Sequence, residues 1–272
     1  MSELMRPIQF DKLMKWSFME YEKQGSIFGI KKEKFYRNKS GTNIEIFGDR
    51  ISSPVGPAAG PNAQLSQNII ASYLGGSRFI ELKTVQKMDG EDLRKCIARP
   101  CINAEDEGYN VEWSTELTVE EAFDEYIKGY IALHILAKEL EISDEADFLF
   151  SMSVGYDLEG IKSDKINNYI EGMKDASSTE IWKRCVEWIK KNISKFKKFK
   201  EEDIKKINPR VCSTICLSTL HGCPPAEIER IAKYLISEKK LNTYIKCNPT
   251  LLGYEFARNT LNKMGYGYIT FD

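Results

Sequence analysis

Two lysines stand at the carboxyl ends of short apolar runs. Lys83 follows the apolar part of RFIELKTVQ (78–86), and Lys246 lies in NTYIKCNPT (242–250), two residues before Asn248. An ammonium group at such a position can stabilise negative charge on a bound ring. Functional groups of parallel β/α barrels gather at the carboxyl ends of the strands. We therefore expect both lysines to contribute to one small-molecule site, and Asn248 to contact the substrate there.

A histidine and a cysteine follow another apolar run, RVCSTICLSTL (210–220). A thiol can deliver or remove a proton during hydride transfer, which makes Cys223 the candidate catalytic residue. His221 is the alternative acid, because an imidazole has an ordinary pKa of ~6.5. The competing interpretation of Cys223 is a buried, inert structural thiol.

Small residues end the first apolar run, ISSPVGPAAGP (51–61). Ala58, Ala59 and Gly60 leave room for a flat ligand to lie on the backbone, whose N–H and C=O groups can bind it. A further apolar run, DFLFSMSVGY (147–156), is followed by Asp157.

The apolar runs alternate with helical patterns along the chain. Strands are expected at 51–61, 78–86, 147–156, 210–220 and 242–250, and YGYITFD (266–272) begins a sixth. Such alternation predicts an α/β fold with a parallel sheet covered on both faces. An open doubly wound sheet and an incomplete (β/α)8 barrel both fit this order, and the strand-end residues favour the barrel.

Two domains are expected. Residues 1–47 form a helical lead-in, whose apolar face is Phe10, Leu13, Met14, Phe18 and Tyr21. Residues 48–272 form the first part of the barrel, with helical excursions at 87–146 and 160–208.

Local signals refine three helical segments. Thr118 and Glu121 predict a capping box at the start of a helix over about 118–140. His134, in the apolar pattern of that helix, is expected to be a core residue with its hydrogen bonds satisfied. The charged run 195–206 predicts a solvated helix face or loop.

The composition restricts the class of protein. Lysine plus arginine total 39 and aspartate plus glutamate 40, so the net charge of −1 gives no reason to expect nucleic acid or an anionic membrane as a partner. No apolar stretch approaches the ~20 residues that span a bilayer, and the start lacks the apolar core of a secretion signal. We therefore expect a cytoplasmic protein that acts on a small-molecule substrate.

The seven cysteines are odd in number and include no C-x-x-C pair. This usage predicts reduced thiols, with neither a disulfide framework nor a metal site. Cys212 and Cys216 are expected to share one strand face as small buried hydrophobes.

Several motifs in order resemble a known family. SPVGPAAGPN, FIELKTVQ, SMSVGYDLEG, STLHGCPP and YIKCNPTLLG resemble the first five strands of the dihydroorotate and dihydropyrimidine dehydrogenases. A closer resemblance, from about Met5 to Asp272, is to the selenate reductase subunit family of large bacterial flavoproteins. It rests on SIFGI, PCINAEDE, EWSTELT, SVGYDLEGI, LSTLHGCPP and KCNPTLLGY.

The resemblance implies a barrel of the dihydroorotate dehydrogenase type that binds FMN. The substrate would be a small cyclic amide of pyrimidine or purine type. Iron–sulfur clusters (4Fe-4S), FAD and NAD(P)H would belong to other modules of the same polypeptide or to partner subunits.

The resemblance also implies roles for individual residues. Ala58 and Ala59 match positions whose backbone holds the flavin, and Lys83 matches a flavin-contacting lysine, with Thr84 beside it. Lys246 matches a second lysine near the flavin. Cys223 matches the acid or base that acts on the substrate.

Two departures from the family pattern keep other functions open. Asp157 stands where relatives commonly carry an asparagine at the flavin's pyrimidine edge, and an aspartate has no amide to donate from. His221-Gly222 displaces the residues that usually precede the cysteine. These departures motivate an alternative, in which a catalytically degenerate barrel is a scaffold or subunit of a multi-component reductase.

A third interpretation is a flavin-free barrel enzyme that uses Lys83 or Lys246 as a Schiff-base nucleophile. In every case the unfinished sheet would leave an unpaired edge. We therefore expect residues 1–272 alone to be poorly stable and inactive.

Overall fold

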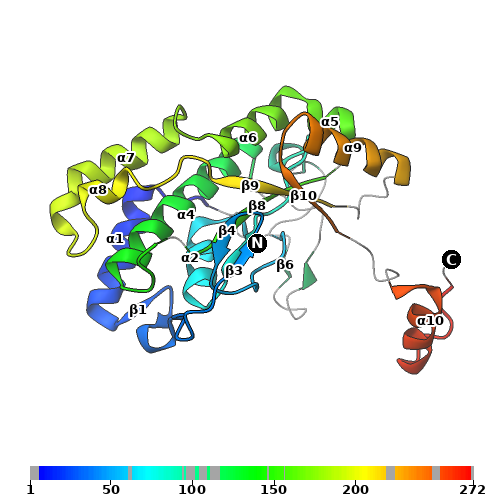
Figure 1. Cartoon of the computed structure of the whole chain (residues 1–272), viewed down its shortest axis with the longest axis horizontal. Coiled ribbons are helices and arrows are strands. Elements are labelled where there is room, and N and C mark those ends of the chain that lie inside the picture. Colours follow the sequence, from blue (N-terminus) through cyan, green and yellow to red (C-terminus); the bar gives the residue numbers. More distant parts are fainter. Residues whose placement is uncertain are drawn as a thin grey trace.

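The computed structural model describes residues 6–60, 63–93, 95, 102–103, 109–110, 117–145, 147–155, 157–218, 224–246 and 252–270. Its centre is a four-stranded parallel sheet (Figure 1). The strands are β5 (Phe79–Glu81), β8 (Leu149–Val154), β9 (Cys212–Leu217) and β10 (Asn242–Ile245).

The strands of this sheet lie side by side in chain order, β5-β8-β9-β10. A doubly wound sheet reverses its strand order at a switch point, whereas a β/α barrel adds each strand beside the previous one. The observed order is therefore that of a barrel. Over the described residues the sheet does not close.

The outer strands nevertheless approach each other across the concave face of the sheet. Phe79 on β5 and Tyr244 on β10 have ring centroids 5.6 Å apart, in an edge-to-face contact. In a flat sheet three strand spacings, about 14 Å, would separate these strands. The sheet is therefore strongly curled, as expected of part of a barrel.

The first predicted strand is present only in part. Ile51 belongs to β4 (Asp49–Ile51), which forms a hairpin with β3 (Ile44–Ile46). The following residues run beside β5, where the Val55 carbonyl accepts from Arg78 N–H at 2.9 Å and the Pro57 carbonyl accepts from Glu81 N–H at 3.2 Å. Prolines 54 and 57 have no N–H to donate, which prevents a regular ladder here.

Gly56 is required by this close approach to β5. A Cβ at Gly56 would lie 1.4 Å from the carbonyl oxygen of Phe79, so no other residue fits without moving the backbone.

Helices cover the outer face of the sheet (Figure 1). They are α2 (Ser66–Leu74), α4 (Val119–Glu139), α5 (Leu158–Lys162), α6 (Asp164–Lys174), α7 (Glu180–Asn192), α8 (Glu201–Ile204) and α9 (Pro225–Ser237). Shorter elements are β1 (Ser26–Ile27), β2 (Ile30–Lys31), α3 (Gly90–Leu93), β6 (Ile102–Asn103), β7 (Tyr109–Asn110), and the 3-10 turns η1 (Lys32–Lys34) and η4 (Ile193–Lys195).

The core lies between the helices and one face of the strands. Ile80, Leu82, Met152, Val154 and Ile215 are fully buried there. Alternate residues of the same strands face the concave side, where the sheet is polar. No described helix combines the length and apolarity that crossing a membrane requires.

The predicted apolar face of the lead-in helix is confirmed. Helix α1 (Phe10–Gln24) buries Phe10, Leu13 and Met14, while Phe18 and Tyr21 pack partly buried against the core. The capping box of α4 is also confirmed. Thr118 Oγ1 accepts from Glu121 N–H at 3.2 Å, and Glu121 Oε2 accepts from Thr118 N–H at 3.0 Å.

The predicted sixth strand is wrong over the described residues 266–270, which turn back on α10 (Tyr254–Lys263). The Ile269 N–H donates to the Tyr266 carbonyl at 3.1 Å. None of the residues of α10 is buried, and Figure 1 shows α10 set apart from the sheet. A strand forms only against a neighbouring strand, and none of the described residues provides one here.

The charged run 195–206 is anchored rather than simply solvated. The carboxylate of Glu139, at the end of α4, accepts hydrogen bonds from the backbone N–H groups of Lys197, Lys198 and Phe199 at 2.6–2.9 Å. Phe196 and Phe199 are buried in the core. The lysines between these aromatic residues face the solvent, which explains the charged sequence.

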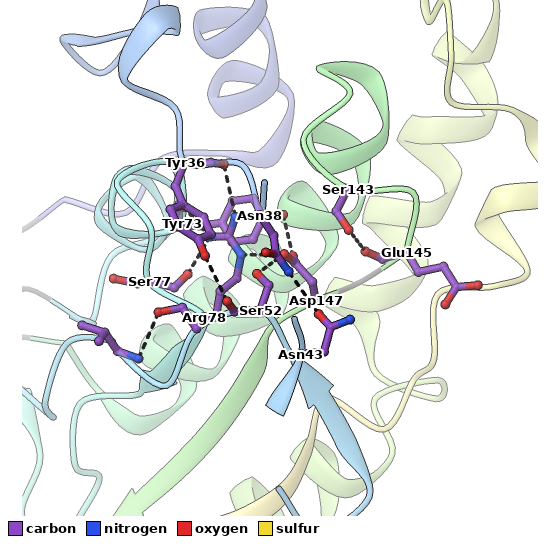
Figure 2. A network of polar contacts seen from close by, with 12 residues as sticks. Tyr36, Asn38, Asn43, Ser52, Tyr73, Ser77, Arg78, Ser143, Glu145 and Asp147 are labelled. Carbon is purple, nitrogen blue, oxygen red and sulfur yellow. Dashed lines mark hydrogen bonds and ion pairs between the residues drawn. The ribbon is translucent and has the colours of Figure 1, made fainter. Parts of the chain in front are cut away.

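A buried arginine ties the amino-terminal ends of the strands together (Figure 2). Arg78 is fully buried, and its Nε donates to Asp147 Oδ2 at 2.8 Å. The same carboxylate accepts from Ser52 Oγ at 2.6 Å and from Tyr73 Oη at 2.9 Å. The ring of Tyr73 also lies 3.9 Å from the guanidinium carbon.

Candidate active site

Glu81 organises the concave face of the sheet at the carboxyl ends of the strands. Its side chain is buried, although it is charged and ends the otherwise apolar strand β5. Glu81 Oε2 accepts from the Ala59 N–H at 2.9 Å and from Lys246 Nζ at 3.0 Å. One carboxylate therefore joins the end of the first strand segment, β5 and the end of β10.

Cys216 on β9 lies beside this carboxylate. Burial, assisted by the negative charge of Glu81, raises the pKa of the Cys216 thiol to about 12. The thiol is therefore protonated at neutral pH and is a poor nucleophile, although it can donate a weak hydrogen bond.

Two polar atoms on the concave face have no hydrogen-bond partner among the described residues. They are Glu81 Oε1 and the hydroxyl of Tyr244, and both atoms are buried. Buried polar atoms usually have a partner, because an unsatisfied one costs about 1–3 kcal/mol. These two atoms are therefore available to a ligand or to water.

Lys83 and Thr84 lie where β5 bulges. The Leu82 N–H donates to the Ser151 carbonyl and the Val85 N–H donates to the Ser153 carbonyl, both at 3.0 Å. One strand thus advances three residues while the other advances two. Bulges of this kind re-aim side chains and are common near active sites.

The bulge fixes both residues. The Lys83 side chain is buried, and its carbonyl accepts from Tyr126 Oη of α4 at 3.0 Å. Thr84 Oγ1 and Ser153 Oγ lie 2.7 Å apart in a hydrogen bond. Both residues are therefore held in place at the predicted end of the barrel.

A second bulge separates the two cysteines of β9. Cys212 pairs with Phe150 and Cys216 pairs with Ser153, since Ser213 is an extra residue in the ladder. Phe150 and Ser153 are three residues apart on one strand, so the two cysteines lie on opposite faces. The prediction that they share a face is wrong for this reason.

Asp157 caps a helix. Its Oδ1 accepts from the Gly160 N–H at 2.7 Å, at the amino end of α5. Aspartate and asparagine are equally good at this position, so capping accounts for the aspartate without any role in flavin contact.

The structure brings together four of the predicted positions: Ala59, Lys83, Thr84 and Lys246 lie at the carboxyl ends of the strands. Ala58 and Gly60 flank Ala59, with Ala58 exposed and Gly60 buried. His221, Cys223 and Asn248 lie outside the described residues, so their roles stay predictions.

Three residues of the site were not predicted from the sequence: Glu81, Cys216 and Tyr244. The signal for Glu81 was present, because a carboxylate within the strand RFIELKTVQ must find partners when the strand is buried. Nothing local marks Cys216 or Tyr244, whose place depends on the curl of the sheet.

Comparison with known proteins places the chain among relatives. Residues 28–272 match the family described as "Oxidoreductase YgfK, N-terminal TIM-barrel domain". The chain is 45% identical over 281 residues to "Putative oxidoreductase YgfK" of Escherichia coli K12, and likewise to its counterpart in Escherichia coli O157:H7. Each match covers 99% of this chain and 27% of the relative, so the chain spans about a quarter of these relatives. No solved structure matches it significantly.

Proposed function

The chain belongs to the family of the YgfK oxidoreductase amino-terminal TIM-barrel domain, and from this premise we propose that it binds FMN at the carboxyl ends of its strands. It moves electrons between the flavin and a small cyclic amide of pyrimidine or purine type. The modules with iron–sulfur clusters, FAD and the NAD(P) site lie elsewhere in a larger cytoplasmic protein. Within the family, the motifs favour the proteins described as selenate reductase subunits, although no selenate ligand set supports that substrate.

One observation carries this proposal. Lysine, threonine and small-residue backbone from separate strands converge on one polar end of a curled parallel sheet, around Glu81. Ligands of TIM-barrel proteins bind at this end.

The residues present fit a flavin. Ala58 and Ala59 offer backbone groups without bulky side chains, and Lys83 and Lys246 offer positive charge. Glu81 Oε1 and the Tyr244 hydroxyl, which have no hydrogen-bond partner among the described residues, are further polar atoms that a ring with donors and acceptors can satisfy. A bound flavin would supply the hydride chemistry.

The chain's own residues would orient the ring and set its charge. Lys83 and Lys246 would stabilise the anionic reduced form. Glu81 is a positioning residue, since its ion pair fixes Lys246 at the end of β10. Cys223, or else His221, would hold or deliver the substrate proton. Cys216 stays protonated and adds no thiolate.

A second candidate function is a scaffold that has lost chemistry. The ion pair between Lys246 and Glu81 favours it, because this pairing neutralises one of the two cations expected at the flavin. The capping role of Asp157 is equally consistent with a structural barrel.

The cofactor released from the protein distinguishes the flavin enzyme from the scaffold. The visible spectrum of the full-length protein that contains this chain, purified without added flavin, is recorded and the released cofactors are identified by chromatography. We expect FMN, and we expect K83A to lose it while circular dichroism shows an unchanged fold. K190A, which removes an exposed lysine from α7, is the matched control and should retain FMN. Absence of FMN, with FAD and iron present, would support the scaffold.

A further inference from the structure

A cavity of about 200 Å³ opens at the end of the sheet opposite to the candidate active site. It lies between the β3–β4 hairpin, α4, the start of β8 and residues 206–213. We call it the amino-terminal cavity. The lining residues that matter here are Asp49, Arg50, Tyr130, His134, Arg210 and Ser213.

The lining of the amino-terminal cavity has an excess of positive charge, with Arg50, Lys206 and Arg210 against the carboxylate of Asp49. Arg50 and Arg210 are exposed, and neither guanidinium has a hydrogen bond or an ion pair with the described residues. Lys206 also lines the cavity, but Asp203 Oδ1 lies 3.2 Å from its ammonium group.

Two carboxylates lie near the cavity, and neither forms an ion pair with Arg50 or Arg210. Asp49 Oδ2 accepts from Ser213 Oγ at 2.6 Å. Asp147, adjacent in sequence to the cavity residue Phe148, points its carboxylate at Arg78 (Figure 2). The two arginines therefore lack an acidic partner in the described part of the chain.

The lining of the cavity also includes a histidine with an unused nitrogen. His134 packs edge-on against Tyr130 at 4.7 Å and against Phe148 at 5.3 Å between ring centroids. Its Nε2 atom is buried and has no partner among the described residues. Burial lowers the pKa of His134 to about 4, so the ring is neutral at pH 7 and can donate from Nε2 in one tautomer.

We propose that the amino-terminal cavity binds a small oxyanion of phosphate size, held by the exposed Arg50 and Arg210 and by the buried Nε2 of His134. Guanidinium groups match the geometry of oxyanions and bind them bidentately. A water molecule takes about 30 Å³ in the liquid, so the cavity has room for one such anion with some water. The bound anion would join the β3–β4 hairpin to α4.

Inorganic phosphate is the probe for this site. The ring resonances of the two histidines are followed by NMR while phosphate replaces chloride at constant ionic strength and pH 7. We expect a saturable shift of one histidine, which H134Q assigns by removing that signal. R50Q and R210Q should each weaken phosphate binding at least tenfold.

The matched control is R184Q, which removes an exposed arginine from α7 and leaves the cavity intact. It should leave the affinity for phosphate unchanged. A parallel measurement is the melting temperature, which should rise with phosphate in the wild type and in R184Q but not in R210Q. The proposal is overturned if no saturable shift occurs, or if R184Q weakens binding as much as R210Q.

Discussion

At the scale of single residues, burial changes the protonation of His134. Its pKa falls to about 4 because the charged imidazolium would lose its hydration among Tyr130 and Phe148. The folded chain therefore binds fewer protons at this residue than the unfolded chain between about pH 4 and ~6.5. The stability associated with neutral His134 is present above ~6.5 and is lost as the pH falls toward 4.

We expect the free energy of unfolding to fall by about 1–3 kcal/mol more in the wild type than in H134Q between pH 7 and pH 4.5. Urea titrations in phosphate-free buffer at several pH values measure this difference. Carboxylates with lowered pKa, such as Asp203, affect both proteins alike and cancel. Parallel pH profiles for the two proteins would show that His134 does not carry the effect.

The sequence predicted where the candidate site lies in the fold, but it did not predict which residues of the site contact one another. Lys83 and Lys246 lie where the strand-end rule places them, because carboxyl ends of parallel strands share one edge. That Lys246 meets Glu81 could not be predicted, since the two residues are far apart in sequence and meet only across the curled sheet. The raised pKa of the Cys216 thiol comes first from burial and then from the negative charge of Glu81, which the same curl of the sheet brings beside it.

At the scale of elements, local signals succeeded where local interactions decide the structure. The capping box of Thr118 and Glu121 and the apolar face of α1 involve neighbours within a few turns. The strand expected at 266–272 failed, because a strand depends on a distant partner that sequence periodicity does not reveal. The lysines of the run 195–206 predict a solvated segment. Its structure is instead determined by the buried Phe196 and Phe199 and by the distant Glu139.

Arg78, Asp147, Ser52 and Tyr73 form a largely buried polar cluster, which we call the Arg78 cluster (Figure 2). It connects segments that are far apart in the sequence. R78M should destabilise the chain by about 3–5 kcal/mol, because it leaves the carboxylate of Asp147 buried without its cation. Chemical denaturation measures the loss. R184Q, which breaks an exposed ion pair with Asp124, should cost less than about 1 kcal/mol. Equal losses in the two variants would contradict a structural role for the cluster.

At the scale of the whole molecule, the curl of the sheet decides what the chain can bind. Exposed apolar side chains lie at both edges of the sheet. Val55 beside β5 is 66% exposed, and Ile245 on β10 is 47% exposed. Further strands between these two edges would cover both residues and close the barrel.

The ion pair between Glu81 and Lys246 tests the curl directly. A flat sheet would keep β5 and β10 about 14 Å apart, so their side chains would contribute independently to stability. In the curled sheet the two charges are 3.0 Å apart, with the Lys246 side chain 34% exposed and the Glu81 side chain 8% exposed. We therefore expect a double-mutant cycle of E81Q and K246Q to give a coupling energy of about 1–2 kcal/mol, reduced from that of a buried pair by solvent around Lys246.

The exposed pair Glu187–Lys191 on α7 is the reference and should give about 0.3–0.5 kcal/mol. Coupling no larger than that of the reference pair would contradict a persistent contact between Glu81 and Lys246, and Glu81 could then not position Lys246 at a flavin.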